Sequence, residues 1–87
     1  MRQDLGMTTS NEVWEAITRL TPRGEWLSLA ALYDIVSRDV TLSPEDELAI
    51  SAKNRSPRWK RTTRNALQRH KLMGDIEWDG AGRYRLP

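Results

Sequence analysis

One stretch of the chain carries, at helical spacing, side chains that can bond the edges of nucleic-acid bases. Arginine bonds guanine through two donors at once, and asparagine and glutamine bond adenine in a similar two-point way. Residues that are three, four and seven positions apart share one face of an α-helix. A face without carboxylates also differs from the Glu/Lys mixtures of ordinary solubilising surfaces. The candidate base contacts are Arg61, Arg64, Asn65 and Gln68.

Positive charge is concentrated in the same part of the chain. Residues 1–50 contain four basic and nine acidic residues, whereas residues 51–87 contain ten basic and three acidic ones. The overall net charge of +2 therefore averages a net −5 and a net +7. Between residues 51 and 72 there are eight basic residues and no acidic one. Such a stretch repels itself unless an anionic partner neutralises it, although a solvated basic helix face is the alternative interpretation.

A second group of basic and hydroxyl side chains is expected to contact phosphates. Backbone N–H groups at a helix start favour anions, and arginine forms forked contacts with phosphate oxygens. For Ser56 a role as helix cap is the favoured alternative, and the two hairpin arginines are equally partners of nearby acids. The candidates are Lys53, Arg55, Ser56, Arg58, Lys60 and Thr62 at the entrance of the basic helix, and Arg83 and Arg85 near the C-terminus.

The residue types available for catalysis or metal binding are few. The chain has no cysteine and only one histidine, His70. This composition excludes disulfides and Cys/His zinc sites, and it leaves little nucleophile–base chemistry. We therefore expect a binding protein that is not an enzyme and uses no metal or cofactor. There is no apolar run near the eighteen or so residues that cross a bilayer and no signal peptide, so we expect a cytoplasmic, nucleoid-associated protein.

The candidate base contacts require a long helix to position them. Ser56-Pro57 is a cap followed by proline, which predicts a helix start, and Gly74 supplies an end signal. The predicted helix covers residues 57–73. Its opposite face is mildly apolar and is expected to meet the core with Trp59, Thr63, Ala66, Leu67 and His70.

Two further helices and a short extended piece precede it. The pattern Thr9-x-x-Glu12 is a capping box that predicts a helix over residues 10–21. Ser28 can cap a second helix that runs to about residue 38, after an extended piece at 25–27. Ser43-Pro44 predicts one or two helical turns, with the acids at 45–47 at the positive end of its dipole. Residues 1–8 are expected to form a flexible tail and residues 9–87 a single domain.

The C-terminal stretch alternates apolar and charged residues, which predicts a β-hairpin around Gly80-Ala81-Gly82. The two arginines then lie opposite an acidic row of Asp75, Glu77 and Asp79. The inward set is Ile76, Trp78, Tyr84 and Leu86.

This order of elements predicts a mainly α fold with a small β-hairpin, a winged helix-turn-helix. The helix at 57–73 would lie in the major groove and the hairpin at 75–87 would be the wing. The expected partner is therefore double-stranded DNA. A winged helix used for dimerisation or docking to a protein, without DNA contact, is the alternative.

Three motifs carry a family resemblance: Leu42-Ser43-Pro44-Glu45-Asp46, Ala66-Leu67 through Gly74, and Gly82-Arg83-Tyr84-Arg85-Leu86. The chain resembles the winged-helix domain of Mrr-type restriction proteins. It is similar also to the C-terminal winged helix of adenine-methyl-dependent restriction endonucleases of the Dam-replacing type. The resemblance implies the DNA-reading module of a prokaryotic restriction-modification or defence system, with a nuclease domain fused to it or associated with it. The chain itself carries no nuclease motif.

A reader of methylated bases needs an aromatic wall for the methyl group. Trp59, near the DNA-facing end of the predicted helix, is the candidate for this contact, and a core position is its alternative. The sequence does not give the target site, the methylation state of the base or the oligomeric state.

Overall fold

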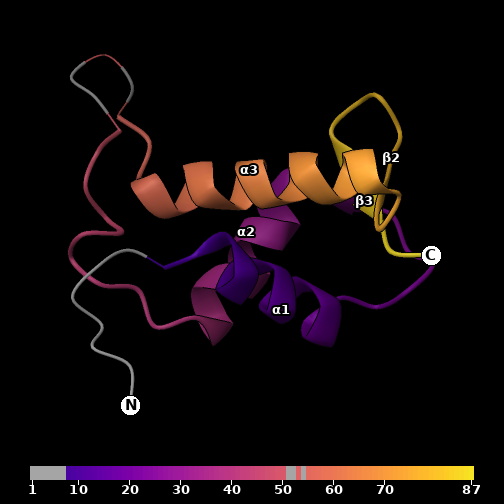
Figure 1. Cartoon of the computed structure of the whole chain (residues 1–87), viewed down its shortest axis with the longest axis horizontal. Coiled ribbons are helices and arrows are strands. Elements are labelled where there is room, and N and C mark those ends of the chain that lie inside the picture. The colour runs from indigo at the N-terminus through magenta and orange to yellow at the C-terminus, as the bar shows by residue number, and fades with distance from the viewer. Residues whose placement is uncertain (1–7, 51–52, 54) are drawn as a thin grey trace.

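In the part of the chain that the structure describes, three helices and three short strands follow one another (Figure 1). The computed structural model describes residues 8–50, 53 and 55–87. The described elements are α1 (Ser10–Leu20), β1 (Leu27–Ser28), α2 (Leu29–Asp39), α3 (Arg58–Met73), β2 (Glu77–Trp78) and β3 (Arg83–Arg85).

Local signals set most helix ends. The predicted capping box is confirmed, because Thr9 accepts from the Glu12 backbone N–H and Glu12 accepts from the Thr9 backbone N–H. Ser28 caps α2 through the backbone N–H of Ala31. Gly74 ends α3 with a φ of 84°, a left-handed conformation that glycine adopts at little cost. At the start of α3, however, Pro57 occupies the cap position and no side chain caps the helix, so the cap role predicted for Ser56 is wrong.

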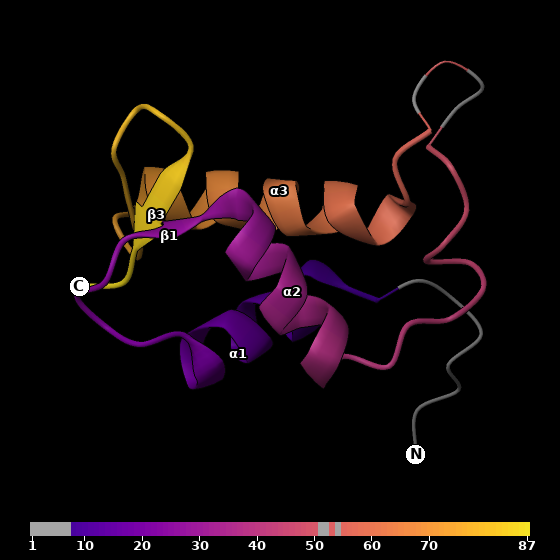
Figure 2. The same ribbon diagram turned by 180° about the vertical axis from the view of Figure 1, so that it is seen from behind.

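The helix α3 lies along one side of the molecule, and α1 and α2 lie along the other (Figures 1 and 2). Its predicted core face is buried between them, and His70 at the end of that face is partly exposed. Because one face of α3 is committed to the core, the opposite face points to solvent. The buried apolar cluster consists of Val13, Ile17, Leu32, Val36, Trp59, Ala66, Leu67, Ile76 and Leu86.

The strands form one antiparallel sheet in the order β1-β3-β2, at the C-terminal end of α3 (Figure 2). The predicted hairpin is confirmed, and the extended piece before α2 adds a third strand by pairing Leu27 with Tyr84. The inward position predicted for Trp78 is wrong, since its side chain is 46% exposed. It lies on the edge strand β2, where the Lys71 ammonium sits 4.2 Å from the ring centroid.

The segment between α2 and α3 is irregular. The helix predicted from Ser43-Pro44 is wrong, because residues 44–47 form only a turn with bonds from Glu47 N to Pro44 O and from Leu48 N to Glu45 O. Asp46 turns inward instead of lying at a helix dipole and is 1% exposed. Its carboxylate accepts four hydrogen bonds, from the backbone N–H and the hydroxyl of both Ser43 and Thr8. We call Thr8, Ser43 and Asp46 the Asp46 clasp.

The predicted tail of residues 1–8 is one residue too long, because Thr8 belongs to the Asp46 clasp. Thr8 is 4% exposed and belongs to the folded part, while residues 1–7 lie outside the described residues. The same segment is tied to the start of α3, since Trp59 N donates to Asp46 O at 3.1 Å and Arg58 N donates to Leu48 O at 2.9 Å. The clasp therefore connects the entrance of α1 to the entrance of α3.

Burial of the Asp46 carboxyl opposes ionisation, but the four hydrogen bonds from Ser43 and Thr8 outweigh it and hold its pKa below the usual value. A lowered pKa in the folded state means that the carboxylate stabilises the fold at neutral pH. That stabilisation is lost as the pH falls from the unfolded value of about 4 through the folded one.

We predict that Asp46→Asn lowers the free energy of unfolding at pH 7 by about 1.5–3 kcal/mol, because an amide cannot accept all four bonds and its own donor faces other donors. Urea unfolding would measure the change at pH 7 and at successively lower pH. The difference from wild type should shrink on acidification, as the wild-type carboxylate becomes protonated. Glu45→Gln, at an exposed neighbour, is the matched control. Equal stability of Asp46→Asn and wild type at pH 7 would contradict this role.

Candidate nucleic-acid interface

The outward face of α3 presents three of the four predicted base contacts to solvent. Arg61, Asn65 and Gln68 are exposed, whereas Arg64 is half-buried. All four lie on the same helix, which contains no carboxylate along its length. This side of α3 therefore offers donors and acceptors for a polar ligand without any competing acid on the helix itself.

Arg64 differs from the other three because it is tied to α2. Its Nη1 donates to the Tyr33 hydroxyl at 3.1 Å. Tyr33 also lies edge-on to Trp59, with ring centroids 5.6 Å apart and an angle of 82° between the rings. The contact orients one guanidinium while leaving its other donors available.

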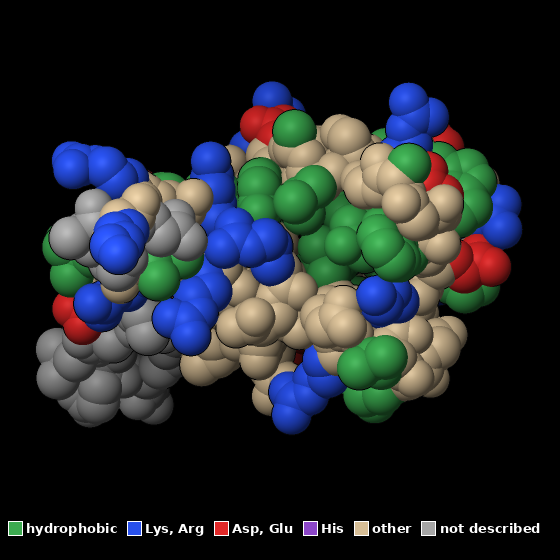
Figure 3. All heavy atoms as spheres, turned by 90° about the horizontal axis from the view of Figure 1, so that it is seen from above, with side chains coloured by type: hydrophobic (Ala, Val, Ile, Leu, Met, Phe, Trp, Pro, Cys, Tyr) green, Lys and Arg blue, Asp and Glu red, His purple; other side chains and the backbone are tan. Residues whose placement is uncertain are grey.

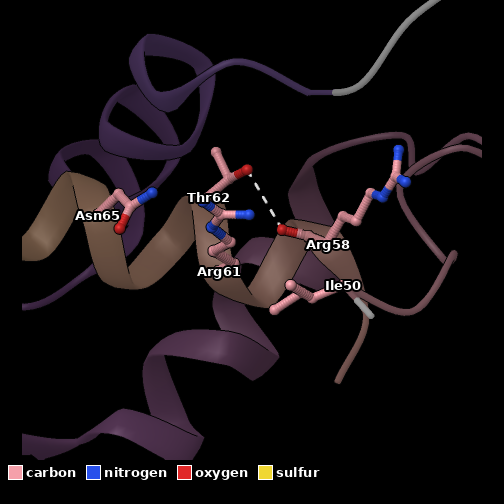
Figure 4. Close-up of a pocket in the computed structure, with 5 residues that line it drawn as sticks. All are labelled: Ile50, Arg58, Arg61, Thr62 and Asn65. Carbon is pink, nitrogen blue, oxygen red and sulfur yellow. Dashed lines mark hydrogen bonds between the residues drawn. The ribbon is translucent and has the colours of Figure 1, made fainter. Parts of the chain in front are cut away.

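A hollow of about 370 Å³ opens beside the N-terminal half of α3 (Figure 4). Arg61 and Asn65 line it from successive turns, and Ile50 closes it from the preceding segment (Figure 4). The Thr62 hydroxyl is turned back to donate to the Arg58 carbonyl at 3.2 Å. The hollow is thus lined by cationic and amide groups beside one apolar side chain, which suits a polar or anionic group.

Basic side chains outnumber acidic ones on the surface above α3. Figure 3 shows Lys and Arg side chains spread over this face, around hydrophobic side chains that gather in its middle, with Asp and Glu visible near its edge. Lys53, Arg55 and Arg69 are exposed like Arg61, and Arg58 is half-buried. Charges of one sign gathered on one face attract polyanions from a distance.

Lys60 is held closer to the protein than its neighbours. Its ammonium lies 5.2 Å from the centroid of the Tyr33 ring and 5.7 Å from that of the Trp59 ring. Both distances are within the range of a cation–π interaction. The charge of Lys60 is therefore positioned by Tyr33, which also orients Arg64, together with Trp59.

The two hairpin arginines have different surroundings. Arg85 donates to Glu77 at 2.7 Å and lies 4.5 Å from the centroid of the Trp26 ring. The hydrogen bond with Arg85 lowers the pKa of Glu77. Arg83 is exposed, and within the described residues its side chain makes no hydrogen bond or ion pair. Of the two alternatives open for this pair, the acidic partner applies to Arg85. Arg83 attracts the Asp79 carboxylate without an ion pair or a side-chain hydrogen bond in the described residues, and its exposed side chain can reach a ligand.

The acidic row opposite these arginines is only partly a set of ion pairs. Asp79 accepts the backbone N–H groups of Ala81 and Arg83, which close the turn and lower its pKa. Asp75 bonds His70, whose Nδ1 lies 2.8 Å from the Asp75 carboxylate. The His70 ring stacks on Trp14 with centroids 3.8 Å apart, so it belongs to the junction of α1 and α3.

Trp59 occupies the core and not the outward face. It is 6% exposed, and its Nε1 donates to Glu47 at 3.2 Å. A ring so covered has no face for a methylated base to pack on, which corrects the methyl-contact role expected for Trp59. The alternative core position is the one observed.

No known protein family, curated protein or solved structure matches the chain. Within the described ranges, no three His, Asp or Glu side chains gather as metal ligands would. No helix of the same ranges has the length and apolar character needed to cross a bilayer. The resemblance to restriction proteins therefore stays a prediction from the sequence motifs.

The sequence pattern does not predict the roles of two residues that shape this surface, Tyr33 and Ile50. Tyr33 lies beside the apolar stripe of α2, four residues after Leu29. A polar-tipped aromatic at the border of such a stripe is a weak signal for a contact to a neighbouring element. Ile50 lies in an irregular segment, where periodicity gives no signal.

We predict different costs for truncating two tryptophans. Trp59→Ala should lower the free energy of unfolding by about 3–5 kcal/mol, because it empties a buried site. Trp78→Ala should cost about 1 kcal/mol or less, because the ring is half-exposed at a sheet edge. Denaturant unfolding followed by circular dichroism would compare them. Similar costs for the two variants would contradict the burial of Trp59.

Proposed function

We propose that this chain is a winged helix-turn-helix domain that binds double-stranded DNA through α3. The observation that carries the proposal is the outward face of α3, where Arg61, Asn65 and Gln68 are exposed beside an oriented Arg64 on a helix free of carboxylates. These side chains are the ones that bond guanine and adenine edges in the major groove.

The arrangement of the elements supports this proposal. The order α1, β1, α2, α3, β2, β3 is that of a winged helix, and the hairpin lies at the C-terminal end of α3 (Figure 1). The hairpin leaves the outward face of α3 uncovered. A helix of sixteen residues is about 24 Å long, and the major groove admits an α-helix.

Phosphate contacts are proposed on both sides of the helix. Lys53, Arg55 and Arg58 flank its N-terminal end, and Arg83 lies on the hairpin at the other end. Lys60 and Thr62 belong to the same flank, although each already has an intramolecular contact. Contacts at both ends would fix the register of α3 in the groove.

The role in a prokaryotic restriction or defence system is the biological part of the proposal. It rests on the resemblance to Mrr-type and Dam-replacing-type proteins, with nuclease activity in a separate domain. A cytoplasmic, nucleoid-associated location follows from DNA as the partner. Trp59 is not part of a methyl-reading site, so any dependence on methylation would come from the outward face of α3.

One observation favours the alternative of a docking domain. Leu72 is 75% and Met73 is 63% exposed at the end of α3, and Trp78 on β2 is 46% exposed. Large apolar side chains left exposed next to one another, as at Leu72 and Met73, are typical of protein contacts. Absence of DNA binding at low salt would favour this function.

The proposal predicts steeply salt-dependent affinity for duplex DNA. About four phosphate contacts give a slope near −4 in a plot of log K against log salt concentration, so that affinity falls roughly 100-fold between 50 and 200 mM salt. Fluorescence anisotropy with a labelled duplex would measure this slope. No binding at 50 mM salt, or binding insensitive to salt, would contradict the proposal.

Substitutions should separate base contacts from phosphate contacts. Asn65→Ala should relax preference at one base pair by about 1–3 kcal/mol. Lys53→Ala should weaken all duplexes about equally and reduce the salt slope by about 1. Arg38→Ala, on α2 and paired with Asp34, is the control and should leave binding unchanged. If Asn65→Ala lowered the affinity for every DNA sequence equally, that result would contradict the assignment of Asn65 as a base contact.

A further inference from the structure

We infer that Tyr33 is a positioning residue that sets the base preference of α3 by holding Arg64, and that the target site carries a guanine at the base pair which Arg64 meets. The inference rests on the proposed function, because it names a feature of the DNA that the same surface would bind. Tyr33 lies on α2, outside the helix that carries the base contacts.

Arg64 is the oriented member of the outward face. Its Nη1 donates to the Tyr33 hydroxyl at 3.1 Å, and its side chain is half-buried. Within the described residues, the side chains of Arg61, Asn65 and Gln68 make no hydrogen bond and are exposed. A tethered guanidinium loses less conformational freedom when it binds, so its contacts contribute more to selectivity than those of a mobile one.

Tyr33 can act as a tether because its own ring is fixed. The ring lies edge-on to the buried Trp59, which donates to Glu47 through Nε1. The Lys60 ammonium lies on the same ring, 5.2 Å from its centroid. Packing against the core therefore fixes the position of the Tyr33 hydroxyl. The hydrogen bond from Arg64 to this hydroxyl in turn fixes the position of the guanidinium.

The remaining donors of Arg64 point to guanine as the base. A guanidinium has five N–H donors, and the bond to Tyr33 uses one of them. A pair of parallel donors is left, which matches the O6 and N7 acceptors of guanine in the major groove. Lysine could not replace Arg64, since it lacks this fork.

Tyr33→Phe tests the inference with little disturbance of the fold. The substitution keeps the ring, its edge contact with Trp59 and its contact with Lys60, and it removes only the hydroxyl. Ser37→Ala is the matched control, because it removes a hydroxyl from the same helix that is exposed and donates to the Asp34 carbonyl instead of to α3. Thermal unfolding by circular dichroism should give similar midpoints for the wild type and Tyr33→Phe.

The binding experiment has two steps. Selection from random duplexes with the wild-type chain identifies its preferred site, and anisotropy competition then measures every single-base change in that site. We expect one guanine whose replacement costs affinity in the wild type. Tyr33→Phe should reduce that preference about 3- to 10-fold, which corresponds to the loss of one hydrogen bond. Arg64→Ala and Arg64→Lys should abolish it, and Ser37→Ala should leave it unchanged.

The outcomes distinguish the two levels of the proposal. If the wild type binds no duplex, the proposed function fails. If it binds and Arg64→Ala removes a guanine preference that Tyr33→Phe retains, the positioning role is overturned while the function stands. A uniform loss of affinity on all sequences in Tyr33→Phe would overturn it too, since that result assigns the hydroxyl to a phosphate. A wild-type site without a guanine that depends on Arg64 would overturn the assignment of the base.

Discussion

The burial of one face of α3 against α1 and α2 is the constraint on which the rest of the surface depends. Trp59, Ala66 and Leu67 join the core cluster, and Thr63 is buried beside them with its hydroxyl bonded to the Trp59 carbonyl. A helix held by one face cannot rotate about its axis without exposing that face, at a cost of roughly 1.5–3 kcal/mol for each large apolar side chain. The outward side chains are therefore presented at fixed angles around the helix.

The two ends of α3 are held by different parts of the chain. At the N-terminal end, the segment that contains the Asp46 clasp bonds Arg58 and Trp59 through its carbonyls. At the C-terminal end, the left-handed Gly74 turns the chain so that Asp75 reaches His70. Because both ends are anchored, a ligand that binds the outward face meets an ordered helix and not a fraying one.

The basic residues of this domain carry the same charge but differ in how available their side chains are to a ligand. Arg85 and Arg83 share a strand, yet Arg85 is paired with Glu77 across the sheet and Arg83 is exposed. Lys60 lies on the Tyr33 and Trp59 rings and Arg64 bonds the Tyr33 hydroxyl, whereas Arg61 faces the hollow beside Ile50. Exposed cations such as Arg61 and Arg83 can adapt their position to a polyanion. Cations with an intramolecular contact, such as Lys60 and Arg64, would bind a ligand from a fixed position.

The sequence by itself determined α1, α2 and α3, the pairing of β2 with β3 and the face of α3 that turns outward, although it also predicted a helix after Ser43 that the structure does not form. These features depend on periodicity and on caps within about four residues, such as Thr9 with Glu12, and local signals of this kind are visible in the order of residues. Only the tertiary structure decided the role of Asp46, whose partner Thr8 is 38 residues away, and of Tyr33, whose partner Arg64 is 31 residues away. It also exposed Trp78 and buried Trp59, although both stand at apolar positions of their patterns. Such outcomes depend on which elements pack against one another across the core. Residues that meet in this way are far apart in the sequence, so no local periodicity or capping motif predicts their contact.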